Sequence, residues 1–277
     1  MVGLVWGLAL LAGGVLLAAD PIEVRLWPGG APNGWKAQFE ERGKDGVQDR
    51  SLTNIGDPVI TVFLPPPERR NGGALLIAPG GGYHHLAYDK EGLDIARWVN
   101  TLGLVGVVLK YRMPDMPAAS LRPALFGDAK AAAKAVHVPV EDAEEAMRII
   151  RGRAKEWGIA PQHVGMMGFS AGGHLAALMG MSQNKEVRPN FLALLYPAIP
   201  EPLYVTGETP TTFLAHADDD ALSAENSVRF YLALKQAKVP AELHIFAGGG
   251  HGFGLKKTGK TSEAWPERFA AWLKRGH

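Results

Sequence analysis

The sequence feature that most constrains the fold is a Gly-x-Ser-x-Gly segment at 168–172. It lies between an apolar run at 164–167, which predicts a buried strand, and a helix-like run at 175–181. A strand that turns this sharply into a helix needs glycines at the contact, because they let the two elements approach closely. The side chain between the glycines, Ser170, is then held clear of the backbone at the amino end of a helix. The segment therefore predicts one strand–turn–helix unit of an α/β sheet.

Strand-like and helix-like patterns alternate along most of the chain. Strands are expected at 73–78, 104–109, 164–167, 191–196, 211–216 and 241–246, and helices at 89–102, 139–159, 175–181, 223–238 and 262–275. The segments 22–27 and 59–64 have the pattern of antiparallel edge strands that lead into the sheet. We predict an α/β fold whose mostly parallel central sheet carries helices on both faces.

Composition excludes several classes of function. The formal net charge is +1 and the basic residues are scattered, which argues against a nucleic-acid or anionic membrane partner. The chain has no cysteine, so disulfides, thiolate metal sites and cysteine nucleophiles are excluded. No group of potential ligands has the spacing of a metal site, and we expect neither a metal nor a cofactor.

The first residues form an almost unbroken apolar run that ends at Ala19. We interpret residues 1–19 as a signal peptide cleaved near Ala18 or Ala19, which makes the protein exported, either periplasmic or secreted. No basic residue precedes the run, so an uncleaved N-terminal anchor is the alternative. Residues 20–277 are expected to form a single domain with no other membrane segment.

Two further segments carry the chemistry that Ser170 needs. A glycine run follows the apolar strand at 73–78, and the N–H groups of Gly81 and Gly82, with that of Ala171, could stabilise an oxyanion. His251 lies among glycines in the last strand–helix loop, where it could act as the base. A serine nucleophile, then an aspartate after a later strand, then a histidine is the chain order of α/β-hydrolases.

The chain resembles the acetyl-xylan-esterase-like branch of the α/β-hydrolases, relatives of carbohydrate acetyl esterases and carboxylesterases. The matching segments are Leu26-Trp27-Pro28, 78–83, 109–112, 168–176, Asp219-Asp220, 225–227 and 249–254. The resemblance covers nearly all of 26–255. The stretch 113–138 is longer than the family pattern, and we interpret it as an insertion that borders the site.

The acid is ambiguous from the residues alone, because Asp218, Asp219 and Asp220 are consecutive. The resemblance implies a fixed spacing from the acid to a serine in the next helix. Asp219 with Ser227 fits that spacing, so we predict Asp219 as the partner of His251.

The resemblance implies a serine esterase that hydrolyses short-chain acetyl esters, on plant polysaccharide or its oligosaccharides, through an acyl-enzyme. Tyr83 and His84 adjoin the glycine run and are predicted to contact the substrate, whereas His174 and His216 are expected to be structural. The alternatives are a serine peptidase of the prolyl-oligopeptidase kind, or a non-catalytic binding protein on the same fold. The partner is then a small-molecule or oligosaccharide ester.

Overall fold

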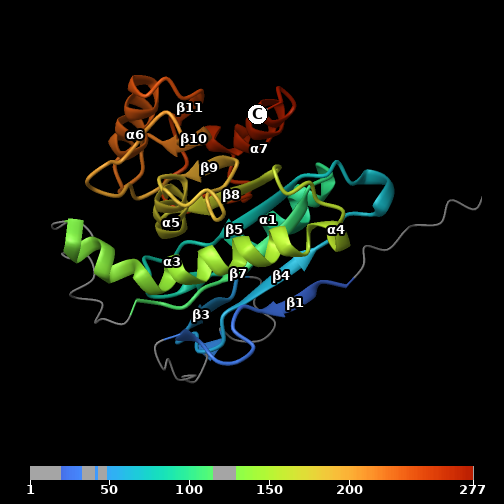
Figure 1. Cartoon of the computed structure of the whole chain (residues 1–277). Coiled ribbons are helices and arrows are strands. Elements are labelled where there is room, and N and C mark those ends of the chain that lie inside the picture. The colour runs from blue at the N-terminus through green and yellow to red at the C-terminus, as the bar shows by residue number, and fades with distance from the viewer. Residues whose placement is uncertain (1–19, 33–40, 43–48, 115–128, 277) are drawn as a thin grey trace, which may run out of the picture.

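A central sheet of eight strands organises the computed structural model, which describes residues 20–32, 41–42, 49–114 and 129–276 (Figure 1). Its strands, in chain order, are β1 (Ile22–Arg25), β4 (Val59–Phe63), β5 (Ala74–Ala78), β7 (Val105–Lys110), β8 (Val164–Phe169), β9 (Phe191–Leu195), β10 (Thr211–Ala217) and β11 (Ala241–Phe246). Their order across the sheet is β1-β4-β7-β5-β8-β9-β10-β11. The pairs β1–β4 and β4–β7 are antiparallel, and the other pairs are parallel.

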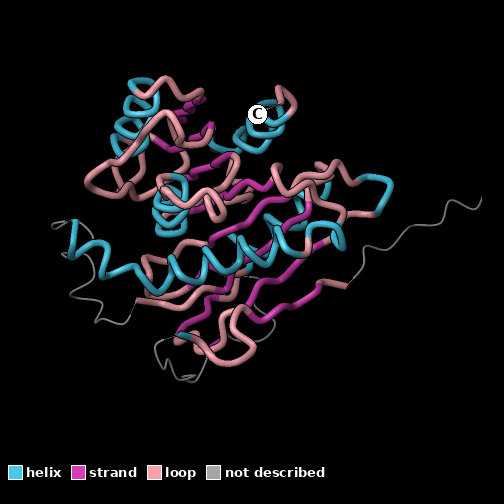
Figure 2. Tube along the Cα trace, viewed as in Figure 1, coloured by secondary structure: helices cyan, strands magenta, loops and turns pink. Residues whose placement is uncertain are grey.

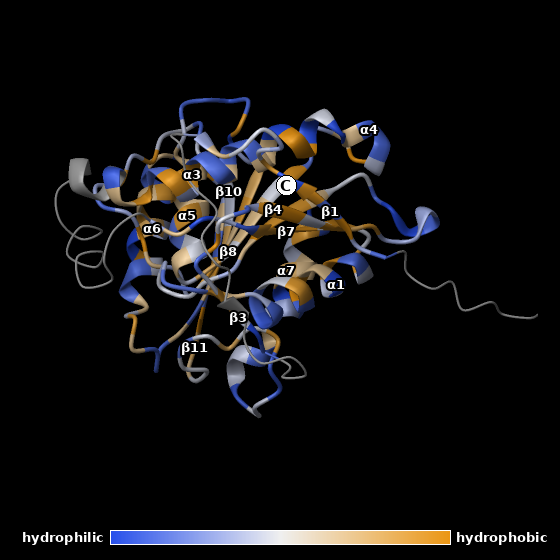
Figure 3. Cartoon of the chain, turned by 90° about the horizontal axis from the view of Figure 1, so that it is seen from below, coloured by the Kyte–Doolittle hydropathy of each residue, from blue (hydrophilic) through white to orange (hydrophobic). Residues whose placement is uncertain are grey.

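Burial follows from the position of each strand in the sheet. Every residue of β5, β7, β8 and β9 is buried, as expected for parallel strands that are covered on both faces. The sheet is accordingly the most hydrophobic layer of the molecule (Figure 3). The edge strand β1 instead alternates half-buried with exposed residues. The predicted fold class is confirmed, including the antiparallel edge.

Helices cover both faces of the sheet (Figure 2). They are α1 (Asp94–Thr101), α3 (Ala129–Gly152), α4 (Ala154–Trp157), α5 (Ala171–Gly180), α6 (Glu225–Gln236) and α7 (Trp265–Leu273). Helices α3, α5 and α6 lie on one side, and α1 and α7 on the other (Figure 3). On that second side Trp98 of α1 packs edge-on against Trp265 of α7, with ring centroids 5.0 Å apart.

The secondary structure differs from the sequence-based expectations in two helices and in one additional sheet. Helix α3 begins at Ala129 rather than at Pro139, because the Ala/Lys-rich segment has enough helix propensity to continue through the proline. The helix expected from Asp89 starts instead as a π-helix, Asp89–Leu93, before α1. A small second sheet, β2 (Glu41–Arg42), β3 (Ser51–Thr53) and β6 (Leu86–Ala87), was not predicted.

A buried ion pair attaches α3 to the sheet. Asp142 accepts hydrogen bonds from the backbone N–H and the guanidinium of Arg112, at 2.7–3.0 Å, and from the indole of Trp27 at 2.8 Å. Buried charges persist where they are paired in this way. Residues 115–128 of the predicted insertion lie outside the described residues, as does the predicted signal peptide. Among the helices that are described, none combines the length and apolarity needed to cross a bilayer.

Candidate active site

Ser170 stands at the turn from β8 into α5, at the carboxyl edge of the sheet. Its φ angle is +52°, a conformation that non-glycine residues rarely adopt and that marks stored strain. Both flanking glycines are required by close contact. A Cβ on Gly168 would lie 2.1 Å from the carbonyl oxygen of Gly172, and one on Gly172 would lie 2.0 Å from that of Ala78. The predicted strand–turn–helix geometry is therefore present, with the serine at its corner.

The glycine run after β5 lies directly beside this corner. A Cβ on Gly80 would lie 2.9 Å from the Cβ of Ser170, so only glycine allows this approach. Within the described residues, no acceptor pairs with the N–H of Gly81 or of Gly82. The N–H of Ala171 begins α5 and has no acceptor inside the helix. The loop that carries Gly81 and Gly82 therefore reaches the serine at Gly80, and the oxyanion role of Gly81, Gly82 and Ala171 stays a prediction.

His251 connects the serine to a buried carboxylate. Its Nε2 lies 2.8 Å from the Oγ of Ser170, and its Nδ1 lies 2.8 Å from Oδ2 of Asp220. Because a carboxylate only accepts, Nδ1 carries the proton and Nε2 is left to accept from the serine hydroxyl. The Asp220 side chain is 0% exposed, whereas that of His251 is 38% exposed. This arrangement orients the imidazole and leaves the reacting side open to a substrate.

The prediction of Asp219 as the partner of His251 is wrong. Asp219 is exposed, and its Oδ1 accepts the backbone N–H groups of Gly249 at 2.8 Å and Gly250 at 2.7 Å. These two hydrogen bonds lower the pKa of the Asp219 carboxyl. Asp218 and Asp219 form a turn directly after β10, in which the N–H of Asp220 donates to the carbonyl oxygen of Ala217 at 3.2 Å. This turn brings Asp220 rather than Asp219 to the imidazole. Asp219 instead fixes the loop that carries His251.

His216 anchors the loop of residues 218–222, which contains Asp220, from its buried side. This agrees with the structural role expected for His216. It is buried, and its Nδ1 lies 2.8 Å from the hydroxyl of Ser227. Its Nε2 lies 2.8 Å from the carbonyl oxygen of Leu222 and 3.2 Å from Oδ2 of Asp220. Burial lowers the pKa of His216. Ser227, whose spacing favoured Asp219 in the sequence, therefore binds His216 and neither aspartate.

The structure also corrects one predicted substrate contact. Tyr83 is only 2% exposed, and its hydroxyl lies 3.0 Å from Nδ1 of His174 on α5. Burial lowers the pKa of His174 to about 4, so this imidazole stays neutral. Tyr83 therefore supports the glycine loop from inside the core. His84 is exposed on the same loop, where contact with a substrate stays a prediction.

Two residues beside the site were missed by sequence reasoning. Glu91 lies in the π-helix and is buried, which raises the pKa of its carboxyl. Tyr196 follows β9 with a φ of +38°, and its ring packs 5.1 Å from that of His251. In the sequence Glu91 fits a helical pattern and Tyr196 ends an apolar run. Neither pattern signals a site, because the contacts involved join segments far apart in the chain.

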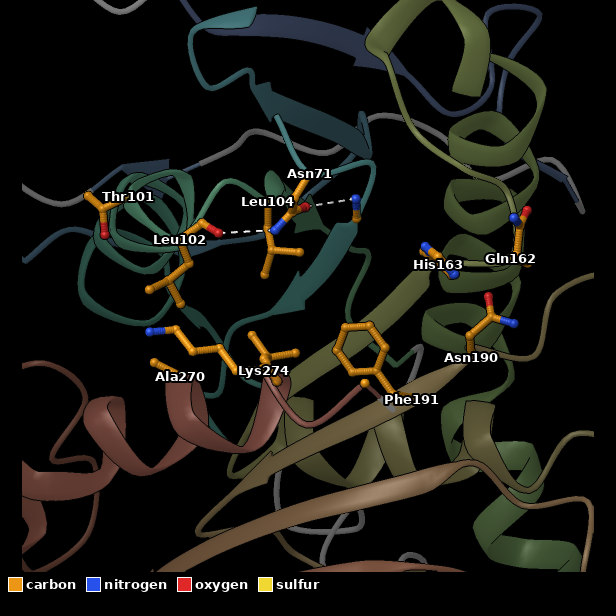
Figure 4. Close-up of a pocket in the computed structure, with 13 residues that line it drawn as sticks. Asn71, Thr101, Leu102, Leu104, Gln162, His163, Asn190, Phe191, Ala270 and Lys274 are labelled. Atoms are coloured by element: carbon orange, nitrogen blue, oxygen red, sulfur yellow. Dashed lines mark hydrogen bonds between the residues drawn. The ribbon is translucent and has the colours of Figure 1, made fainter. Parts of the chain in front are cut away.

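A separate hollow of about 800 Å³ lies at the opposite edge of the sheet (Figure 4). Its walls include Gly73, Leu104, His163 and Asn190, which immediately precede β5, β7, β8 and β9. The six residues of β8 place it about 20 Å from Ser170. Among the described residues, no group of three or more His, Asp or Glu side chains is placed to hold a metal ion.

Comparison with known proteins identifies the family. Residues 62–200, half of the chain, match BD-FAE. The chain belongs to the BD-FAE family. The matched range contains the glycine loop and Ser170, whereas Asp220 and His251 follow it.

Relatives of this BD-FAE chain include enzymes that act on xylan or its acetyl esters, as their names state. An acetylxylan esterase of Xylanibacter ruminicola is 31% identical over 222 residues, which is 68% of this chain and 42% of the relative. An endo-1,4-beta-xylanase B of Butyrivibrio fibrisolvens is 28% identical over 153 residues, 41% of this chain and 24% of the relative. The chain therefore spans less than half the length of these relatives.

Solved structures agree on the fold of this BD-FAE member. An acetyl ester-xyloside bifunctional hydrolase from Caldicellulosiruptor lactoaceticus has a TM-score of 0.68 and 26% identity, with 94% of this chain and 97% of that chain covered. An α/β hydrolase from a Medee basin deep-sea metagenome library has a TM-score of 0.62 and 26% identity, with 87% and 98% covered. The predicted α/β-hydrolase fold is thus confirmed.

Proposed function

We propose that this protein is a serine esterase that hydrolyses acetyl and other short-chain esters on plant polysaccharide or its oligosaccharides. The observation that carries the proposal is the hydrogen-bonded chain from Ser170 through His251 to the buried Asp220. The names of the relatives support the substrate class, since they include an acetylxylan esterase and an acetyl ester-xyloside hydrolase.

The reaction proceeds through an acyl-enzyme. Ser170 Oγ attacks the ester carbonyl while Nε2 of His251 takes its proton, and Asp220 stabilises the imidazolium that forms. The N–H groups of Ala171 and of Gly81 or Gly82 donate to the tetrahedral oxyanion. The intermediate then collapses with cleavage of the ester C–O bond, and His251 passes its proton to the departing sugar oxygen, which leaves as a hydroxyl. Water, activated by the same imidazole, releases the acid and restores the serine.

The test is hydrolysis by the purified protein together with covalent labelling by an organophosphonate. Ser170→Ala should abolish both, whereas Ser182→Ala, beyond the far end of α5, should leave both unchanged. Labelling of Ser170→Ala at the wild-type level would place the nucleophile elsewhere. The folded state of each variant is checked by circular dichroism.

The substrate class is tested with the same preparation. We expect a higher kcat/KM for acetyl than for long-chain nitrophenyl esters, and release of acetate from acetylated xylan. A higher kcat/KM for long-chain esters would contradict the acyl preference. Faster cleavage of a prolyl peptide than of any ester would favour the peptidase alternative.

The N-terminal segment is proposed to direct export. Residues 1–19 have the apolar character of a signal peptide. Expression of the full chain in a bacterium, with N-terminal sequencing of the exported protein, should give a new terminus near Asp20. Recovery of the protein in the membrane fraction with Met1 or Val2 at its terminus would favour the anchor.

A further inference from the structure

A single buried carboxylate, that of Glu91, is linked to both loops that the proposed reaction needs, to one directly and to the other through Tyr196. Oε2 of Glu91 accepts the backbone N–H of Gly80 at 2.8 Å, at the start of the glycine loop. Its Oε1 accepts the hydroxyl of Tyr196 at 3.0 Å. That hydroxyl in turn accepts the N–H of Gly254 at 3.2 Å, in the loop that carries His251. A continuous chain of hydrogen bonds therefore joins the oxyanion side of the site to the histidine side.

The proton arrangement in this chain has one consistent solution. The N–H groups of Gly80 and Gly254 can only donate, so the Tyr196 hydroxyl, which accepts from Gly254, uses its own proton on Glu91. Burial, with the Glu91 carboxylate nearby, raises the pKa of Tyr196 and keeps that proton in place. Both oxygens of Glu91 then face donors. The ionised carboxylate is the form that fits, and burial without these donors would be costly.

The same row of hydrogen bonds also positions the imidazole of His251, through the ring of Tyr196. The Tyr196 ring packs 5.1 Å from His251 and 4.4 Å from Phe253, which lies between His251 and Gly254. The other side of Gly254 is held by Trp265, whose indole N–H donates to its carbonyl oxygen at 2.6 Å. The positive φ of Tyr196 is strain that the surrounding contacts must sustain. A shift of Tyr196 would therefore displace the imidazole of His251, the proposed base.

We propose that Glu91 is a positioning residue, which sets the oxyanion loop and the histidine loop relative to each other through Tyr196. This inference rests on the proposed esterase function. The location of Glu91 in a π-helix agrees with the tendency of such turns to occur at functional sites. The carboxylate also faces His251 with its charge, and attracts the protonated imidazole. Lys90 and the buried hydroxyls of Tyr196 and Tyr111 are the other titratable groups that interact with it.

The test compares three single variants by steady-state kinetics and by the rate of phosphonate labelling. In Glu91→Gln the charge is lost and one oxygen is replaced by a donor, so we expect kcat to fall roughly 10- to 50-fold, less than for loss of an oxyanion donor itself. KM should stay within about twofold, because substrate binding is not altered. In Tyr196→Phe the ring remains but the bridge is cut, and kcat should fall by a similar factor.

The matched control is Asp89→Asn, a carboxylate in the same π-helix that binds Arg50 instead of the site. It should keep the wild-type kcat even if it lowers the melting temperature. Because Glu91 and Tyr196 act in one chain, the double variant should cost about as much as the worse single variant. If the losses in kcat of the two single variants multiply in the double variant, Glu91 and Tyr196 act independently, which would contradict the proposal.

The pH profile separates positioning from mere structural support. Because Glu91→Gln removes a negative charge that interacts with His251, the acidic limb of kcat/KM should move to lower pH in this variant. Tyr196→Phe and Asp89→Asn should leave the limb in place. A Glu91→Gln enzyme with wild-type kcat and an unshifted limb overturns the inference while the esterase proposal stands. A wild-type protein without any Ser170-dependent hydrolysis overturns the esterase proposal itself.

Discussion

The two edges of the parallel sheet differ in what their polar groups do. At the amino edge a hollow of about 800 Å³ is lined by groups that stabilise turns. Asn71, for example, donates to Leu102 O at 3.1 Å and accepts from Gly73 N at 2.9 Å (Figure 4). At the carboxyl edge, the side chain of His251 contacts Ser170 through one ring nitrogen and the buried Asp220 through the other.

The comparison shows that the hollow and the proposed catalytic residues lie at opposite edges of the sheet, so the volume of a hollow is no guide to the proposed site in this molecule. The carboxyl edge carries three strained non-glycine residues, Tyr83, Ser170 and Tyr196, together with the buried carboxyl groups of Glu91 and Asp220. Backbone strain and perturbed buried carboxyl groups tend to cluster at functional sites. The carboxyl ends of parallel strands are also where ligands bind in α/β folds.

The largest expected effect tests the carboxyl edge at its aspartates. Asp220→Asn keeps the shape but favours the wrong imidazole tautomer, a change that costs about 10⁴-fold in kcat in a well-studied serine protease. We expect a loss of that order, measured with an acetyl ester.

The control for this variant is its neighbour. In Asp219→Asn the amide oxygen can still accept the N–H groups of Gly249 and Gly250, so the loss in kcat should be less than about tenfold. The opposite ranking of the two variants would show that the loop rearranges when substrate binds.

A smaller effect tests the cost of burying His174 behind the serine. Burial lowers its pKa from 6.5 to about 4, so between these pH values the unfolded chain binds a proton that the folded protein does not. The free energy of unfolding should therefore decrease as the pH is lowered, and this residue should account for about 2 kcal/mol of the decrease from pH 7 to pH 5. Urea unfolding of wild type and His174→Gln at both pH values measures the difference. Equal pH dependence in the two proteins would contradict the prediction.

The smallest effect is expected at the amino edge. His163 and Lys274 are exposed at the walls of the hollow. Replacing both by alanine should change kcat/KM for an acetyl ester by less than twofold, since no described contact of these side chains reaches the carboxyl edge. A loss of tenfold or more would erase the contrast between the edges and assign the hollow a part in the reaction.

Local patterns in the sequence were sufficient for the strands of the central sheet and for the serine turn. The run 164–167 and the glycines at 168 and 172 determine the turn through short-range sterics. The buried character of the parallel strands follows from their uninterrupted apolar runs. His251 was found because a lone histidine among glycines, after the last strand, fits only one place in the chain order.

Tertiary structure decided what depends on direction and on contacts between distant segments. Which of Asp219 and Asp220 faces the imidazole depends on the turn that follows β10, and the sequence did not reveal how that turn directs each side chain. Tyr83 turned inward because His174 offered its hydroxyl a buried partner. Glu91 reaches Gly80 and Tyr196 across separations of 11 and 105 residues. The sequence by itself placed the reacting groups in order, and only packing brought them into hydrogen-bond distance.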